Sequence, residues 1–581
     1  MTGPAAAASS AGSGIVWEAW SDAVFERARR ENRFVLLDLE AVWCHWCHVM
    51  DQTTYRDPAV IALIRSRYIA VKVDQDARPD LSNRYQDYGW PATIVFDPRG
   101  GEIIKRSGYI PPRQMASVLQ AIIDDPTPGP SVVPQPALQF GQSAALPAAL
   151  RRELEQIHVE HYDFKRGGWG FIHKFLDPAS VELAILQARA GDSQAERMAR
   201  QTLAAQLALI DPVWGGVYQY SAGGDWKEPH FEKIMSMQAD NLRIYSLAYA
   251  AWRDPADLEA AERVRGYLER FLTDAGGALY TSQDADLVPG QHSAEYFELD
   301  DAARRARGVP KVDRHIYARE NGWAIQALAQ FYAATGREPA LRQALRAARW
   351  ILAHRSLPGG GFRHDQSDPA GPYLGDTLAM GRAFLSLYSA TADRRWLERA
   401  RQAARFIEER FATDSLAAGL ATAAAGSALL AAPAPQRDEN IAAARFANLL
   451  FHHTGDPRDR ELAERAMRYL AIPAVARRRP SAGVLLADLE LSTSPTHVTV
   501  VGSRQDPQAE ALFAAALAYP STYLRVDFWD PSEPPPPHTE VEYPRLARAA
   551  AFACSRQRCS LPAFEPDQIR PRIDQLQRAG R

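Results

Sequence analysis

Cysteine is scarce in this chain: its 581 residues include four. So few cysteines exclude the disulfide-dense scaffold of a small secreted domain. The first residues also lack the basic segment and the apolar segment of an export signal. We therefore expect a disordered leader over residues 1–14 and a location in the reducing cytoplasm.

An excess of one charge and a long apolar run are also missing. Lys and Arg number 67 against 70 Asp and Glu, a net charge of -3, whereas nucleic-acid binding needs a concentrated basic surface. The stretch between Asp414 and Arg437 has no charged residue, but it is mostly Ala, Gly, Ser and Thr. Its apolarity is too weak for a membrane span. We expect neither nucleic acid nor a membrane as a partner.

The chain instead shows a change of pattern along its length. Residues 15–125 alternate helical and strand patterns, starting with an amphipathic helix over 17–30, and predict an α/β layer. Five prolines between positions 126 and 136 then predict a linker over 126–145.

The longest part of the chain is predicted to be helical. Residues 146–480 contain Ala- and Leu-rich amphipathic segments, in which a Gly-Gly turn followed by an aromatic residue recurs. Paired helices joined by such loops predict an all-α (α/α)6 toroid, with a bundle or solenoid as the alternative. The strand patterns within residues 481–581 predict a small α/β appendage packed on the toroid.

Cys44 and Cys47 form a C-x-x-C pair between a predicted buried strand and a predicted helix. At the helix N-terminus the dipole favours the Cys44 thiolate, and Cys47, one turn on, can resolve a mixed disulfide. His45 can stabilise the thiolate when protonated, and an exposed Trp46 would offer an apolar contact to a partner. These residues predict redox chemistry.

A second motif supports a thioredoxin-like fold for residues 15–125. Pro91 stands just before a predicted strand, at the place where thioredoxin folds carry a cis-proline against the dithiol. We therefore predict Cys44, Cys47 and Pro91 as catalytic residues, with His45, Trp46 and His48 in supporting roles.

Two other chemistries share these residues. With His48 the pair also matches the C-x-x-C-H motif of haem attachment, but that attachment requires export. Zinc is a second alternative, because Cys44, Cys47 and His48 could supply three ligands. The α/β context favours the dithiol, and we expect no metal and no cofactor.

Several strings resemble one family, the spermatogenesis-associated-protein-20-like proteins. They are CHWCHVM at 44–50, GWP at 89–91, GGWGF at 167–171, PHFEK at 229–233 and SQDAD at 282–286. The resemblance covers nearly the whole chain. It implies a thioredoxin-like domain followed by a six-hairpin α/α toroid like those of glycosidases and sugar epimerases, and it implies little about the reaction.

Loops at one end of such a toroid converge on a cavity, so their polar and aromatic residues are the predicted pocket. These candidates are Trp169, Tyr220, Trp226, His230, Glu232, Asp284 and Asp286. Paired carboxylates would suit glycoside hydrolysis, and a histidine base would suit epimerisation. The alternative for Asp284 and Asp286 is to cap a helix or brace a loop, and the alternative for His230 and Glu232 is a buried, satisfied polar pair.

Three functions follow from these motifs. The favoured one is a thiol–disulfide oxidoreductase or redox sensor whose toroid binds a protein disulfide client or a carbohydrate-like ligand. The second is a carbohydrate-active enzyme with an accessory thioredoxin module, and the third is a non-enzymatic binding scaffold. The pair Cys554/Cys559 does not fit the C-x-x-C pattern, and its role stays open.

Overall fold

The computed structural model describes residues 14–132, 141, 143–412, 418–424, 433–539, 541–544, 546–555 and 558–579. The predicted leader therefore lies outside the described residues except for Gly14. The predicted linker and the uncharged stretch between Asp414 and Arg437 are described in part. None of the helices formed by the described residues is long and apolar enough to cross a membrane.

The N-terminal part of the chain is a thioredoxin-like α/β domain. Its mixed sheet has the order β1-β3-β2-β4-β5, with β1 and β2 parallel to β3, and β4 and β5 antiparallel to their neighbours. The strands are β1 (Trp17–Glu18), β2 (Phe34–Glu40), β3 (Tyr68–Asp74), β4 (Ala92–Phe96) and β5 (Glu102–Ser107).

Helices cover both faces of this sheet. The helices of the domain are α1 (Asp22–Glu31), α2 (His45–Gln52), α3 (Pro58–Arg67), α4 (Pro79–Tyr85) and α5 (Pro112–Asp124). α1 packs on one face and α3 and α5 pack on the other, which is why the central strand β2 is apolar on both sides.

The helix predicted over 17–30 was wrong at its start. Trp17 and Glu18 form the edge strand β1, which pairs in parallel with Ala70 and Val71 of β3. Helix α1 begins at Asp22, because the backbone of residues 17 and 18 is used for the sheet.

The helical region is a ring of helix pairs, which confirms the predicted fold class. Each inner helix contacts the next, and the last inner helix contacts the first. In order around the ring, the inner helices are α7 (Pro178–Arg189), α9 (Met235–Trp252), α13 (Ala318–Thr335), α15 (Leu374–Thr391), α17 (Arg437–Thr454) and α20 (Ala482–Ser492).

Each inner helix packs against one amphipathic outer helix. In the same order the partners are α8 (Ser193–Gln206), α10 (Pro255–Phe271), α14 (Glu338–His354), α16 (Arg394–Phe411), α18 (Pro457–Leu470) and α6 (Ala148–Glu160). The inner helices are buried on most sides and the outer ones on one side, as expected for two concentric layers.

The Gly-Gly turns have a structural reason. Gly216 has a φ of 76°, and a Cβ atom there would lie 2.6 Å from the ring of Tyr267. Glycine is therefore needed both for the backbone conformation and for the close approach of the loop to outer helix α10.

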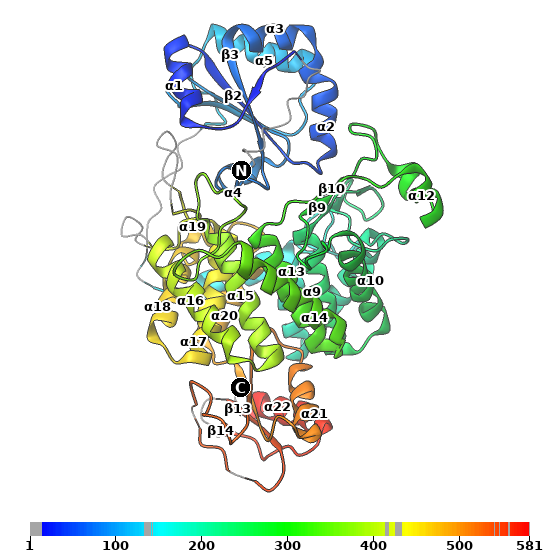
Figure 1. The fold of residues 1–581 in the computed structure, drawn as a ribbon, viewed down its shortest axis with the longest axis vertical. Helices are drawn as coiled ribbons and strands as arrows, with labels where there is room; N and C mark the ends of the chain where they lie inside the picture. The colour runs from blue at the N-terminus through cyan, green and yellow to red at the C-terminus, as the bar shows by residue number, and fades with distance from the viewer. Residues whose placement is uncertain are drawn as a thin grey trace.

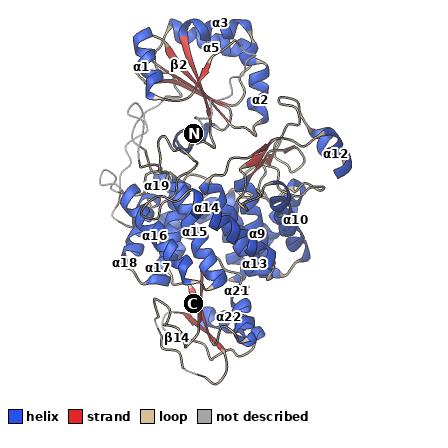
Figure 2. Ribbon diagram, in the orientation of Figure 1, coloured by secondary structure: helices blue, strands red, loops and turns tan. Residues whose placement is uncertain are grey.

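The C-terminal residues form a small α/β unit, as predicted, but it begins after Ser492 and not at residue 481, because α20 packs between α17 and α7 as the sixth inner helix of the ring. Its sheet has the order β12-β11-β13-β14 and is covered by α21 (Pro507–Leu517) and α22 (Pro566–Ala579). The strands are β11 (Thr496–Val501), β12 (Leu524–Trp529), β13 (Ala550–Ser555) and β14 (Arg558–Cys559). Figures 1 and 2 show the thioredoxin-like domain at one end of the helical ring and this appendage at the other.

Candidate functional site

The two cysteines of the C-x-x-C pair lie at the start of helix α2, directly after strand β2. Cys44 is the N-cap of α2, and its Sγ accepts a hydrogen bond of 3.1 Å from the backbone N–H of Cys47. The structure joins the two sulfurs in a disulfide. The Trp90–Pro91 peptide bond is cis, which confirms that expectation for Pro91, and Pro91 is buried.

The helical ring covers this pair. Cys44 is 4% exposed and Cys47 2%. They form one cluster with Ala41 and Trp43, against which Trp90 and Ile234 pack. Ile234 belongs to the loop strand β8 (Lys233–Ile234) of the ring. In Figure 1, α2 lies beside the loops that carry β9 (Ser282–Gln283) and β10 (Val312–Asp313). The dithiol therefore faces the ring, while Trp46 remains 42% exposed.

Both histidines of the CHWCH motif bind one carboxylate of the ring. Nδ1 of His45 lies 2.7 Å from Oδ1 of Asp286, and Nδ1 of His48 lies 3.2 Å from Oδ2 of the same residue. His48 also lies 3.7 Å from Asp284. The backbone N–H of His45 donates to Oε1 of Glu232 over 3.4 Å. Three residues predicted as a toroid pocket are thus brought together with the dithiol.

The three carboxyl groups have different acidities. Burial alone would raise the pKa of Asp286, but hydrogen bonds from His45 and His48 lower it to about 2. Burial raises the pKa of Asp284 to about 6 and that of Glu232 to about 7. Burial opposes protonation of His48, but the hydrogen bond to Asp286 together with the negative charges of Asp284, Asp286 and Glu40 outweighs this effect and raises the pKa of His48. The site thus has one firmly ionised acid beside two that titrate near neutrality.

His230 stands at the edge of this group. It lies 4.0 Å from Glu232, and its ring stacks on Tyr220 with centroids 4.2 Å apart. Burial and the neighbouring histidines 45, 173 and 292 lower the pKa of His230 to about 4. It is therefore neutral at neutral pH and is able to accept a proton.

The two predicted tryptophan platforms lie elsewhere. Trp169 is buried in the core of the ring, stacked on His158. The indole N–H of Trp226 donates to the backbone carbonyl of Arg166, and its ring closes over Gly168. These contacts brace the loops around residues 166–169, and the structure does not bring either indole to the dithiol.

A second connection joins the dithiol motif to the ring. The indole N–H of Trp43 donates to Asp76 over 2.7 Å, and the backbone carbonyl of Asp76 lies 2.7 Å from Nε2 of His364. The other nitrogen of His364 lies 2.8 Å from Asp376. Sequence reasoning missed Asp76, His364 and Asp376, because Asp76 and His364 are 288 positions apart and no local motif marks either one.

Among the described residues, two groups of side chains are close enough to hold a metal ion. His48, Asp284 and Asp286 form one, with ligand atoms within 4.8 Å of one another. The zinc alternative with both cysteines does not match the arrangement, since the sulfurs bond each other and His48 turns to Asp286. In the second group, at Asp38, Glu40 and Asp51, the Lys72 ammonium lies within 3.2 Å of all three carboxylates.

The remaining cysteines form a separate bridge. Cys554 and Cys559 are disulfide-bonded across the paired strands β13 and β14, where they lie opposite each other. Cys554 is buried among apolar residues and Cys559 is exposed.

Known proteins resemble the thioredoxin-like domain and the helical ring separately. The family Thioredox_DsbH, "Protein of unknown function, DUF255", matches residues 8–124. DsbD 2 of Pseudomonas aeruginosa, a thiol:disulfide interchange protein, is 36% identical over 78 residues, 13% of each chain. The structure of a D-mannose isomerase aligns with a TM-score of 0.46 and 15% identity, covering 59% of this chain and 96% of that one.

One relative matches across the domains. Spermatogenesis-associated protein 20 of Homo sapiens is 22% identical over 96% of this chain and 89% of its own length. The Mus musculus protein is 24% identical over 65% of this chain, and the matched region is about half, 49%, of that relative's length. The chain is therefore a homologue of spermatogenesis-associated protein 20 over most of its length, with a Thioredox_DsbH domain in its N-terminal part.

Proposed function

We propose that the protein is a thiol–disulfide redox protein of the cytoplasm in which Cys44 and Cys47 act as a sensor read by the helical ring. The observation that carries this proposal is the cover over the pair: both cysteines are buried beneath Ile234, and the flanking histidines bind Asp286. The similarity to a thiol:disulfide interchange protein supports the redox part.

Burial restricts the partner in the redox step to a small thiol or disulfide. A folded protein client needs its own disulfide to reach Sγ of Cys44, and Ile234 occupies that side while the domains are in contact. A small thiol needs far less space. A protein disulfide client would require the thioredoxin-like domain to leave the ring first.

The reaction balances with a small thiol, RSH, as reductant. Its thiolate attacks Sγ of Cys44, the Cys44–Cys47 bond breaks, and the leaving Cys47 thiolate takes a proton. A second RS⁻ then attacks the mixed disulfide, giving RSSR and a Cys44 thiolate that takes the second proton. In sum, one protein disulfide and two RSH give two protein thiols and one RSSR.

Glu232 is the group best placed to respond to this change. One of its oxygens accepts the N–H of His45 at the N-terminus of α2, where the Cys44 thiolate would form. The other oxygen is buried and has no hydrogen-bond partner in the part of the chain that the structure describes. A thiolate and an ionised Glu232 at one helix N-terminus repel each other in a buried site. Burial raises the pKa of Glu232 to about 7, so Glu232 can take up a proton near neutral pH. Protonation of Glu232 removes its charge and relieves the repulsion.

The contact between the domains would then report the redox state. Reduction places thiol or thiolate groups beside Glu232 and alters the position of Cys44. Trp43 directly precedes Cys44 in the chain and would move with it. Trp43 is linked through Asp76 to His364 of the ring. We propose that this linkage transmits the redox state to a ring that binds a client or a carbohydrate-like ligand.

A carbohydrate-active ring is the second candidate. Its motivation is the set of acids at 232, 284 and 286, whose pKa values are pushed apart as in an acid–base pair. Two contacts disfavour it, since Asp286 is occupied by both histidines and Glu232 by the α2 N-terminus. A non-enzymatic binding scaffold is the third candidate, and measured turnover by either domain would exclude it.

The first experiment is to measure the reduction potential of the Cys44–Cys47 pair in the full chain. Thiol trapping across graded glutathione or dithiothreitol buffers should give a two-electron transition between roughly -120 and -270 mV. A Cys554→Ser/Cys559→Ser variant removes the second pair and serves as the control. A pair that never oxidises, or that stays oxidised in excess dithiothreitol, contradicts the proposal.

A further inference from the structure

The axis of the helical ring contains two neighbouring cavities. One, of about 290 Å³, extends toward the thioredoxin-like domain, where Asn83 of α4 lines it. The other, of about 140 Å³, extends toward the appendage, where Ser521 and Leu524 line it. Arg243, Gln326 and Arg382 line both. The larger cavity has the volume of on the order of ten water molecules and the smaller one that of about five. Because Arg382 lines both, a small organic molecule bound to it has room to extend from one cavity into the other.

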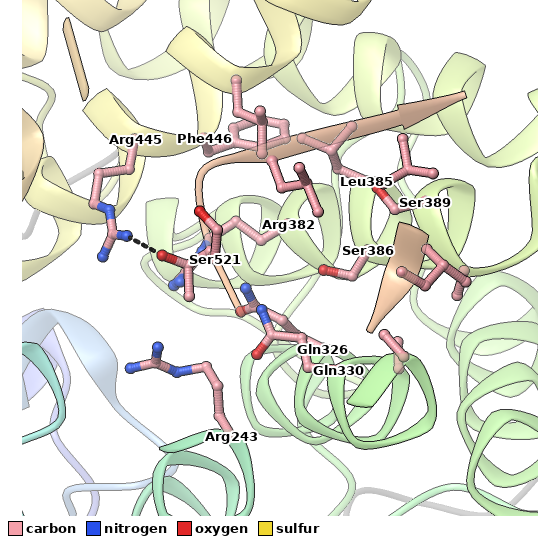
Figure 3. A pocket seen from close by; sticks show the side chains of 18 of the residues that line it. Arg243, Gln326, Gln330, Arg382, Leu385, Ser386, Ser389, Arg445, Phe446 and Ser521 are labelled. Atoms are coloured by element: carbon pink, nitrogen blue, oxygen red, sulfur yellow. Dashed lines mark hydrogen bonds between the residues drawn. The ribbon is translucent and has the colours of Figure 1, made fainter. Parts of the chain in front are cut away.

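Three arginines from three inner helices reach this axis. Arg243 comes from α9, Arg382 from α15 and Arg445 from α17. Figure 3 shows the three guanidinium groups gathered on one side of the smaller cavity.

Two of these arginines are already neutralised. Arg243 lies 2.7 Å from Glu182 and 3.6 Å from Asp240. Arg445 binds Glu182 and, over 2.7 Å, Glu490. The charges of these arginines are therefore balanced within the ring itself.

Arg382 is different from both. Within the described part of the chain, it forms no ion pair and donates no hydrogen bond, although it lies in the interior of the ring. Burial and the charges of Arg243 and Arg445 outweigh the attraction of Asp240 and Glu182 and lower the pKa of Arg382 to about 10. An interior guanidinium needs hydrogen-bond acceptors and a counter-charge, because an unpaired buried charge is costly.

The neighbouring groups indicate what kind of anion would fit. Gln330, which lines the smaller cavity together with Arg382, has a buried side-chain oxygen with no hydrogen-bond partner among the described residues. Such an oxygen accepts from a ligand hydroxyl. Ser386 and Ser521 add hydroxyl groups that can donate or accept. The planar guanidinium of Arg382 suits a carboxylate or a phosphate, which it can bind through two parallel hydrogen bonds.

We infer that the ring axis binds a small hydroxylated organic anion, a sugar acid or a sugar phosphate, through Arg382. The anion forms the direct ion pair that the described residues do not give Arg382, in addition to the more distant charges of Asp240 and Glu182, and its hydroxyl groups pair with Gln330 and the serines. This inference stands on the ring alone and does not depend on the redox chemistry of Cys44 and Cys47.

The test is binding of D-glucuronate and of D-glucose 6-phosphate to the full chain, by calorimetry and by the shift of the melting temperature. D-glucose and sodium chloride at equal ionic strength are the ligand controls, since screened surface charges respond to any salt. We expect at least one of the two anions to raise the melting temperature by about 1 °C or more, and neither control to do so. The anion that binds more tightly identifies the carboxylate or the phosphate class.

Variants at Arg382 separate a ligand site from a structural role. Arg382→Met should weaken anion binding at least tenfold and leave the ligand-free melting temperature equal or higher, because an unpaired charge is removed. Arg382→Lys should retain part of the affinity, and Arg342→Met, on the exposed side of outer helix α14, should retain all of it.

Three results would overturn the inference. The first is binding of neither anion, and the second is an equal effect of glucose or chloride. The third is full affinity in Arg382→Met. Should that variant fold poorly, Gln330→Leu provides the test: it should bind inorganic phosphate as the wild type does and lose its preference for the hydroxylated anion. An unchanged preference in Gln330→Leu would also count against the inference.

Discussion

The two disulfides of this protein are the same bond in contrasting surroundings. Cys44–Cys47 lies at a helix N-terminus under another domain, beside two histidines that bind Asp286 and next to Glu232. Cys554–Cys559 links two paired strands. Cys554 is buried among apolar residues and Cys559 is exposed. The comparison teaches that exchange chemistry depends on the position at a helix N-terminus, which only the first pair has, and on the carboxylates and histidines bound around it.

The largest expected effect comes from removing one cysteine of each pair. Cys44→Ser should abolish reduction of a small disulfide by dithiothreitol, because the attacked sulfur is gone. Cys554→Ser should leave that rate unchanged and lower the free energy of unfolding by about 2 kcal/mol, since a closed loop is opened. Rates from a thiol–disulfide assay and urea unfolding curves measure the two effects. Equal loss of activity in both variants would refute the distinction between the pairs.

A smaller effect is expected from Asp286→Asn, which tests the cover over the first pair. The change replaces charge-assisted hydrogen bonds to His45 and His48 by weaker ones, at a cost of about 2 kcal/mol to the contact between the domains. The reduced variant should therefore react with iodoacetamide roughly 30-fold faster than the wild type if opening limits access.

Asp87→Asn, a substitution at an exposed carboxylate of the same domain, is the matched control for that experiment. Its alkylation rate should equal that of the wild type. An unchanged rate in Asp286→Asn would mean that Asp286 does not hold the domains together at the dithiol.

A third effect depends on pH and concerns the second link between the domains, at His364. Burial opposes its charge, but Asp376 outweighs burial and raises its pKa from 6.5 to about 9. Both of its nitrogens face oxygen acceptors, so the charged ring with two N–H groups is the form that fits. A group with a raised folded pKa stabilises fully below about 6.5 and loses that contribution as the pH rises through about 9.

Below pH 6.5 the charged His364 contributes about 3 kcal/mol to the free energy of unfolding. His364→Gln should therefore melt at a lower temperature than the wild type at pH 6, and the gap should shrink as the pH approaches 10. Melting curves from pH 6 to pH 10 measure this gap. A gap independent of pH would show that His364 does not carry its charge in the folded protein.

Much of the fold could be predicted from local patterns. The apolar run of β2 followed by CHWC, and the proline at position 91, predict the thioredoxin-like domain because each feature depends on neighbours along the chain. Paired amphipathic helices with Gly-Gly turns predict the ring for the same reason. The helix predicted over 17–30 failed at its first residues because an edge strand depends on β3, which lies about 50 positions away.

The candidate site was predicted as two separate sites, and the structure makes them one. CHWCH and the acids at 232, 284 and 286 were each identified by sequence, but their meeting depends on how a domain packs on a ring. The contacts of Ile234 and His364 with the thioredoxin-like domain were not predicted. The sequence around an apolar loop residue or a single histidine does not indicate that it contacts another domain.

By itself the sequence determined the secondary structure of both large domains, the helix-capping position of Cys44 and the presence of a dithiol. These properties follow from the order of neighbouring residues, from hydrophobic period and from residue conformational preference. Only the tertiary structure decided that the dithiol is buried against the ring and that Arg382 has no ion-pair partner among the described residues. Burial and charge pairing are set by residues hundreds of positions apart, and no local pattern encodes which of them meet.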